Sequence, residues 1–66
     1  MTLRVNGRKV EFREGESVKR LLRRMNFNFP LVIVKIDGSI IEEKKYISTK
    51  LHDDAEVEVI HLTSGG

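Results

Sequence analysis

The sequence contains no cysteine and no tryptophan, a single proline, and only four aromatic residues, three phenylalanines and one tyrosine. Without cysteine the chain has no disulfide framework, no thiolate metal ligand and no sulfur nucleophile of its own. No apolar run approaches the roughly 20 residues that cross a bilayer, and the first residues carry charges where a signal peptide needs an apolar stretch. We therefore expect a cytoplasmic protein.

The chain has 66 residues, which is enough for one domain. A chain of this length buries only about 60% of its unfolded surface, so it cannot also enclose a large catalytic cleft. Its formal net charge is +2, with a basic cluster at residues 19–24 and an acidic cluster at residues 53–58. Such charge runs are usually solvated faces. A nucleic-acid-binding surface would instead interleave basic residues with exposed aromatic residues.

The first half of the chain predicts a hairpin followed by a helix. Residues 2–5 and 9–13 alternate between apolar and polar types, and Asn6-Gly7 between them supplies the positive φ angles of a tight turn. Ser17 is a predicted helix cap, and Asn26 is the predicted end of that helix. One stripe of the helix is apolar and consists of Val18, Leu21, Leu22 and Met25.

The middle of the chain predicts two further strands and a loop. Residues 31–36 are almost continuously apolar, which is typical of a central strand covered on both faces or nearly so. Asp37-Gly38 predicts a second hairpin turn, which leads into a short strand. The segment 44–51 predicts a loop or short helical turn that three side chains anchor, namely Tyr46, Ile47 and Leu51.

The last predicted strand runs from residue 56 to residue 62. Val57, Val59 and His61 fall on one face, and the other face carries Glu56, Glu58, Ile60 and Leu62. Carboxylates on that second face predict that it is exposed, so that Ile60 and Leu62 form an apolar docking surface. The alternative is that the register is shifted by one residue, which would place Ile60 and Leu62 in the core.

The predicted element order is β-β-α-β-β-β, with one amphipathic helix lying across one face of a sheet. This order predicts an α+β protein of the β-grasp (ubiquitin-like) class, with a mixed sheet of four to five strands packed on one main helix. The domain is expected to span residues 1–62, and residues 63–66 are expected to form a flexible tail that ends in Gly-Gly. This tail can extend at most about 14 Å beyond Leu62, and its glycines carry no side chain to obstruct a narrow channel.

No pattern of catalytic residues accompanies these elements. His52 and His61 lack cysteine or carboxylate partners at ligand spacing, so we expect surface or half-buried histidines and no metal site. The sequence contains no Ser-His-Asp arrangement, no paired carboxylates and no phosphate-binding loop. We expect a protein that is not an enzyme on its own.

Five short motifs together resemble the ThiS and MoaD family of small ubiquitin-like sulfur carriers over the whole chain. They are "VNG", "SVKRLL", "VIVKIDGSII", "LHDDAEVEVI" and the terminal "GG". The length is closer to ThiS. ThiS-like chains often read Asp-Gly-Asp before the last strand, where this chain has Asp53-Asp54-Ala55, a change that a turn tolerates because Asp adopts positive φ more readily than most residues.

The resemblance implies a chemistry at the carboxyl end. An E1-like enzyme that uses ATP and Mg would adenylate Gly66 and convert it to a thiocarboxylate, with Gly65 and Ser64 entering that enzyme's active site. Partner contact is implied for Ile60, and we extend it to Leu62 and Glu58 beside it. The carrier itself would bind no cofactor, would be a monomer when free, and would contact neither nucleic acid nor membrane.

Several recipients of the sulfur remain open. Thiazole synthase in thiamin biosynthesis is favoured by length; the large subunit of molybdopterin synthase and a tRNA-thiolation enzyme are alternatives, as is ubiquitin-like conjugation to protein lysines. An alternative of another class is a small basic β-grasp RNA-binding module that uses the face of Arg20, Arg23 and Arg24.

Overall fold

The computed structural model describes residues 1–27 and 31–62. In chain order, these residues form β1 (Thr2–Val5), β2 (Arg8–Glu11), α1 (Val18–Arg24), β3 (Val32–Ile36), β4 (Ser39–Ile41), the short 3-10 helix η2 (Glu43–Lys45) and β5 (Glu56–His61). The predicted order of elements is confirmed, and η2 is the short helical turn expected in the polar segment.

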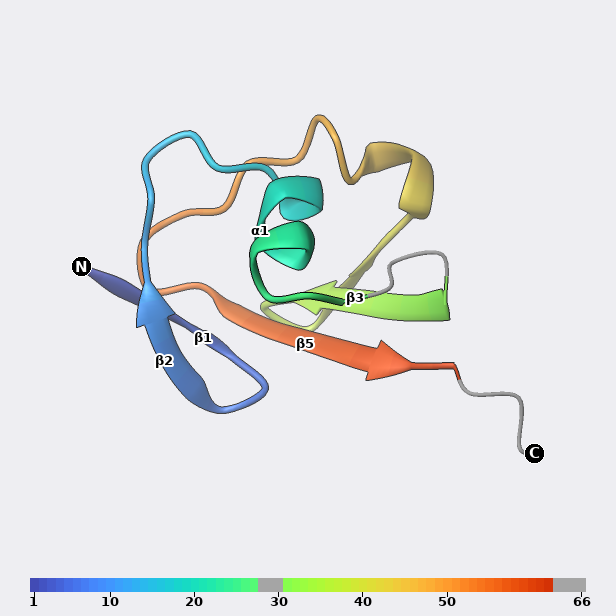
Figure 1. The fold of residues 1–66 in the computed structure, drawn as a ribbon, viewed down its shortest axis with the longest axis horizontal. Helices are drawn as coiled ribbons and strands as arrows, with labels where there is room; N and C mark the ends of the chain where they lie inside the picture. The colour runs from blue at the N-terminus through green and yellow to red at the C-terminus, as the bar shows by residue number, and fades with distance from the viewer. Residues whose placement is uncertain (28–30, 63–66) are drawn as a thin grey trace.

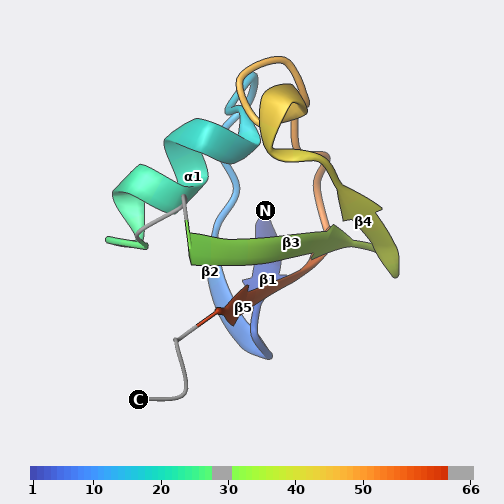
Figure 2. The ribbon, with the colours of Figure 1, turned by 90° about the vertical axis from the view of Figure 1, so that its right-hand side faces the viewer.

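The strands form one mixed sheet in the order β2-β1-β5-β3-β4. β1 and β5 are parallel, and the other neighbours are antiparallel. Helix α1 and η2 lie on the same side of this sheet, and none of the described elements covers its other side (Figures 1 and 2). This is the β-grasp arrangement, so the predicted fold is confirmed. We call the uncovered side the outer face.

The core lies between α1 and the inner face of the sheet. Val18, Leu21 and Leu22 are fully buried, so the predicted helical stripe is confirmed. They pack with alternate residues of the strands, and Met25 is partly buried against them. On the sheet side the buried strand residues are Leu3, Val5, Val32, Val34, Val57 and Val59.

Side-chain and backbone capping fix both ends of α1. The Ser17 hydroxyl oxygen accepts a hydrogen bond from the Arg20 N–H at 3.2 Å, as its capping role predicts. At the other end Asn26 has φ +62°, and the Phe27 N–H donates to the Leu22 carbonyl at 2.8 Å. This left-handed cap is one that asparagine tolerates, and it turns the chain so that Phe27 packs back against the core.

Both hairpin turns have the positive φ angles that their sequences predict. In the first turn Asn6 and Gly7 have φ +53° and +82°, and in the second Asp37 and Gly38 have φ +49° and +86°. Asp54 has φ +66°, so an aspartate occupies the left-handed position in the turn before β5.

Two expectations about buried residues are wrong. The apolar run at 31–36 is covered on one face only: Val32 and Val34 are buried, whereas Ile33 is half-buried on the outer face. Ile47 is 66% exposed. It follows Tyr46 directly in the turn after η2, and Tyr46 and Leu51 alone fill the space beneath this loop.

Candidate docking site at the end of β5

The carboxyl end of β5 points away from the N-terminus, at the end of the sheet where β3 begins (Figure 1). β3 pairs with β5 along its whole length, from Ile36 opposite Val57 to Val32 opposite His61. The Leu62 N–H then donates to the Leu31 carbonyl at 2.7 Å. On this side, backbone hydrogen bonds hold the strand up to its last described residue.

On its other side β5 extends beyond β1, and a side chain replaces the missing backbone. β1 pairs with β5 only at Arg4–Glu56 and Val5–Val57. The Asn6 side chain then donates from Nδ2 to the Val59 carbonyl at 3.2 Å and accepts the Val59 N–H on Oδ1 at 2.8 Å. The amide therefore extends the ladder by one step, although the chain has already entered its turn.

A residue just after α1 contacts the inner face at this end. Phe27 meets the ring of His61 edge-on, with ring centroids 5.6 Å apart and an angle of 69° between the planes. His61 lies on the strand face that also carries Val57 and Val59 but remains exposed, so it is the surface histidine that the sequence predicts. Within the described residues, no three His, Asp or Glu side chains gather as metal ligands.

The outer face at this end is apolar and exposed. Ile60 is 43% exposed and Leu62 is 48% exposed, so the alternative that places them in the core is wrong. Ile33 lies opposite Ile60 in the β3–β5 register and is half-buried, and Leu31 is exposed next to Leu62. We call these four residues, Leu31, Ile33, Ile60 and Leu62, the outer apolar patch.

Sequence reasoning found half of this patch. It singled out Ile60 and Leu62, but it assigned Leu31 and Ile33 to a strand covered on both sides. The unbroken apolar run did indicate that Leu31 and Ile33 are special, but it was attributed to burial on both faces and not to an exposed apolar surface. Glu58 is exposed on the same face, two residues before Ile60 and opposite Lys35. It therefore places a charge beside the patch.

The opposite end of β5 is charged and tightly hydrogen-bonded. Glu56 and Arg4 form an ion pair at 3.0 Å, which raises the pKa of Arg4. The Asp37 carboxylate accepts the Glu56 N–H at 3.0 Å and contacts His52 Nε2 at 2.6 Å. These two contacts lower the pKa of Asp37, and the Asp37 carboxylate raises the pKa of His52.

The three predicted tail residues, Ser64, Gly65 and Gly66, lie outside the described residues. The same is true of the predicted boundary at residue 63, which stays a prediction. Among the described helices, none has the length and apolar character that spanning a membrane requires.

Known proteins resemble this chain in sequence and in fold. A sequence profile described as the ThiS family matches residues 3–66. The crystal structure of the thiamine biosynthesis protein ThiS from Geobacter metallireducens superposes with a TM-score of 0.81, at 27% identity and with 100% of both chains covered. An uncharacterized protein, ycf40, from Porphyra purpurea is 27% identical, and that from Pyropia yezoensis is 29% identical. Each match covers 100% of this chain and 93% of the relative.

The profile covers nearly the whole chain, including the glycines at its end, and the structural match extends over every strand of the sheet. The chain therefore belongs to the ThiS family.

Proposed function

We propose that this protein is a sulfur carrier, in which an E1-like enzyme adenylates the carboxylate of Gly66 and the acyl group is then converted to a thiocarboxylate. The observation that carries the proposal is the outer apolar patch. It lies exposed at the end of the one strand that leads toward Gly65-Gly66, in a chain of the ThiS family. The patch would dock the partner, and the tail would enter its active site.

The chemistry explains why a partner is needed. A terminal carboxyl group has a pKa near 3.5, so at neutral pH it is an anion and a poor electrophile. In the proposed first step a carboxylate oxygen attacks the α-phosphorus of ATP and pyrophosphate leaves. In the second, sulfur at the hydrosulfide level attacks the carbonyl carbon; the carbon–sulfur bond forms, the carbon–oxygen bond to the phosphate breaks, AMP leaves with that oxygen, and loss of the sulfur-bound proton gives the thiocarboxylate. ATP and Mg are bound by the enzyme, and the carrier is its substrate.

The likeness to a thiamine biosynthesis protein and the length of the chain favour thiazole synthase as the recipient of the sulfur. The molybdopterin synthase large subunit and a tRNA-thiolation enzyme are the alternatives. We place the carrier in the cytoplasm as a monomer. Capture of bound enzymes from native cells separates these routes, because each recipient is a different protein.

An intact-mass spectrum of protein isolated from its native cells tests the carrier role. We expect a mass gain equal to the exchange of one oxygen for sulfur, localised by fragmentation to Gly66. A variant with one alanine added after residue 66, and not trimmed back, is expected to lose this modification because the activated carboxylate is displaced. Full complementation by that uncleaved variant in cells would refute the proposal.

A pair of substitutions tests the docking role of the patch. Ile60→Asp is expected to lower the efficiency of adenylation by at least about tenfold, because the loss of an interface hot spot typically costs about 2 kcal/mol or more. Ile40→Asp is the matched control, since Ile40 is 65% exposed on the same face but pairs with Lys35 near the far edge. Equal effects of the two variants on adenylation, or unfolding of Ile60→Asp, would contradict docking through Ile60.

A further inference from the structure

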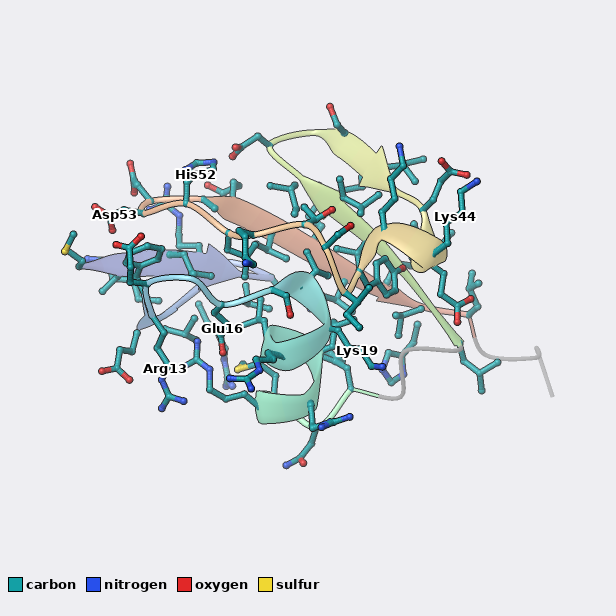
Figure 3. All side chains as sticks on the ribbon, turned by 90° about the horizontal axis from the view of Figure 1, so that it is seen from above. Arg13, Glu16, Lys19, Lys44, His52 and Asp53 are labelled. Atoms are coloured by element: carbon teal, nitrogen blue, oxygen red, sulfur yellow. The ribbon has the colours of Figure 1, made fainter. Side chains whose placement is uncertain are left out.

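On the helix side of the molecule, a basic hollow of about 420 Å³ lies between the start of α1 and the segment that follows η2. Four cations line it, and the apolar residue Ile47 lies beside them. The cations are Lys19, Arg20, Arg23 and Lys50. Figure 3 shows Lys19 on α1, on the side of the sheet opposite the outer face. We call this feature the basic hollow.

Three of the four cations of the basic hollow differ from Arg4, Arg13 and Arg24 in their partners. Arg4 is paired with Glu56 and Arg13 with Glu11. Arg24 donates to both carboxylate oxygens of Glu16, at 3.1 and 2.9 Å, and to the Glu11 carbonyl. Within residues 1–27 and 31–62, by contrast, the side chains of Arg20, Arg23 and Lys50 have no carboxylate partner.

Arg20 and Arg23 also line a second, adjoining hollow of about 400 Å³. Its other side chains are Arg13, Arg24 and Glu16, and Arg24 already binds the Glu16 carboxylate. The two hollows share two guanidinium groups, so the positive surface is elongated. An anion with several charges in a row fits such a surface better than a single-charge anion does.

The backbone around the basic hollow is fixed. The Val18 and Lys19 N–H groups donate to the carbonyls of Thr49 and Tyr46, both at 2.9 Å, and the Leu51 N–H donates to the Glu16 carbonyl at 3.0 Å. These bonds hold Lys50 beside the first turn of α1. They also occupy the first helical amides, so attraction for an anion comes from the side chains.

We propose that the basic hollow binds an oligophosphate group. The guanidinium fork of arginine matches phosphate oxygens in a bidentate geometry, and two such forks shared by adjoining hollows favour an anion that carries several phosphate groups in a row. The only aromatic residue of the adjacent segment, Tyr46, is buried, so the site offers no ring on which a base can stack. Recognition is therefore of phosphate alone, either in a free oligophosphate or in a nucleic-acid backbone.

This site differs from the RNA-binding face that the sequence suggested. That face counted Arg24, which the structure commits to Glu16, and it missed Lys50, which is 26 positions from that arginine in the chain but lies against the helix start. The proposal does not rest on the carrier role, because none of the four residues of the outer apolar patch is among the described residues that line the two hollows.

Titration of the ¹⁵N-labelled full chain with inorganic tripolyphosphate tests the proposal. We expect saturable chemical-shift changes centred on Ser17, Arg20 and Lys50. The double variant R20A/R23A is expected to weaken binding by at least about tenfold, because two charge-assisted hydrogen-bonding groups are lost. The control R8A/K9A removes the same charge from the exposed strand β2 and is expected to change binding less than twofold.

Equal weakening by the two double variants would overturn the proposal, because it would show that only net charge matters. Failure of tripolyphosphate to saturate would overturn it too. A second titration with a 12-base-pair RNA duplex identifies the source: tighter binding of the duplex, with a steep dependence on salt, assigns the nucleic-acid backbone, and tighter binding of tripolyphosphate assigns a free oligophosphate. Deletion of Gly65-Gly66 is expected to leave both affinities unchanged. A protein that fails as a sulfur carrier can therefore still be tested for phosphate binding.

Discussion

Replacing Asn6 by glycine is expected to loosen the end of β5 without disturbing the first hairpin. Glycine adopts φ +53° at no steric cost, so the turn conformation is retained. What is lost is the side-chain amide that satisfies both the N–H and the carbonyl of Val59. Val59 is buried, and the pairing of β1 with β5 ends at Val5–Val57. No backbone group of β1 is therefore in place to bond the N–H and carbonyl of Val59.

The magnitude follows from leaving the part-buried Val59 N–H without a protein partner, since a buried donor left unpaired costs about 1–3 kcal/mol. A domain of this size has a total stability of roughly 3–10 kcal/mol, so the loss is a large fraction of it. We expect a decrease of roughly 4–8 °C in Tm for each kcal/mol lost. Urea unfolding followed by far-UV circular dichroism measures it, and hydrogen exchange at the Val59 N–H locates it.

Asp54→Gly is the matched control for the flexibility that glycine adds to the unfolded chain, an effect of about 0.4–1 kcal/mol. Asp54 also has positive φ, at +66°, and its side chain makes none of the described hydrogen bonds. If Asn6→Gly cost no more than Asp54→Gly, and the Val59 N–H stayed protected from exchange, the inference that the Asn6 amide completes the ladder would be refuted.

Three further predictions concern pH, a buried ion pair and the loop after η2. Both ring nitrogens of His52 face oxygen acceptors, Asp37 and the Asp53 carbonyl, so the doubly protonated ring fits best. Its raised folded-state pKa gives a stabilisation that is fully present below the unfolded pKa of about 6.5 and is lost as pH rises through the folded pKa. Tm measured against pH should therefore fall more steeply above pH 6.5 in the native protein than in His52→Gln, and parallel curves would exclude this role. Glu16→Gln should destabilise by about 1–3 kcal/mol in urea, because Arg24 loses its charged acceptor; Glu14→Gln, at an exposed position, should be neutral, and equal midpoints would argue against the pair. Leu51→Ala should cost about 2–5 kcal/mol and Ile47→Ala less than about 0.5 kcal/mol; the reverse order of midpoints would restore Ile47 as a buried anchor.

The elements that local signals specify were predictable from sequence. The Ser17 cap, the apolar stripe of α1 and the two Xaa-Gly hairpin turns each depend on residues a few positions apart, and the structure confirms them. The second role of the turn residues was not predictable in this way. Asn6 bonds to Val59, 53 positions away, and Asp37 bonds to the Glu56 N–H, 19 positions away. A turn signal already accounts for Asn or Asp at these positions, so nothing in the local pattern indicates a further partner.

The apolar run of residues 31–36 shows where periodicity alone is ambiguous. A strand buried on both faces and a strand with one buried face and one exposed apolar patch have the same sequence pattern. Only the register, which sets Ile33 opposite the exposed Ile60, distinguishes them. Expecting β-branched residues to be buried favoured the first interpretation, although a surface that docks a partner also selects them.

The two candidate surfaces lie on opposite sides of the sheet, and this separation has a consequence. The outer apolar patch belongs to the uncovered side of the sheet. The basic hollow is lined by residues of α1 and of the segment after η2, and both elements lie on the other side of the sheet (Figures 1 and 2). A partner that covers Ile60 and Leu62 therefore need not cover Arg20, Arg23 or Lys50, so both surfaces can be occupied at once. Ile60→Asp should leave tripolyphosphate binding unchanged, and R20A/R23A should leave adenylation unchanged. If either change alters both activities, one partner spans both sides and the two sites are not independent.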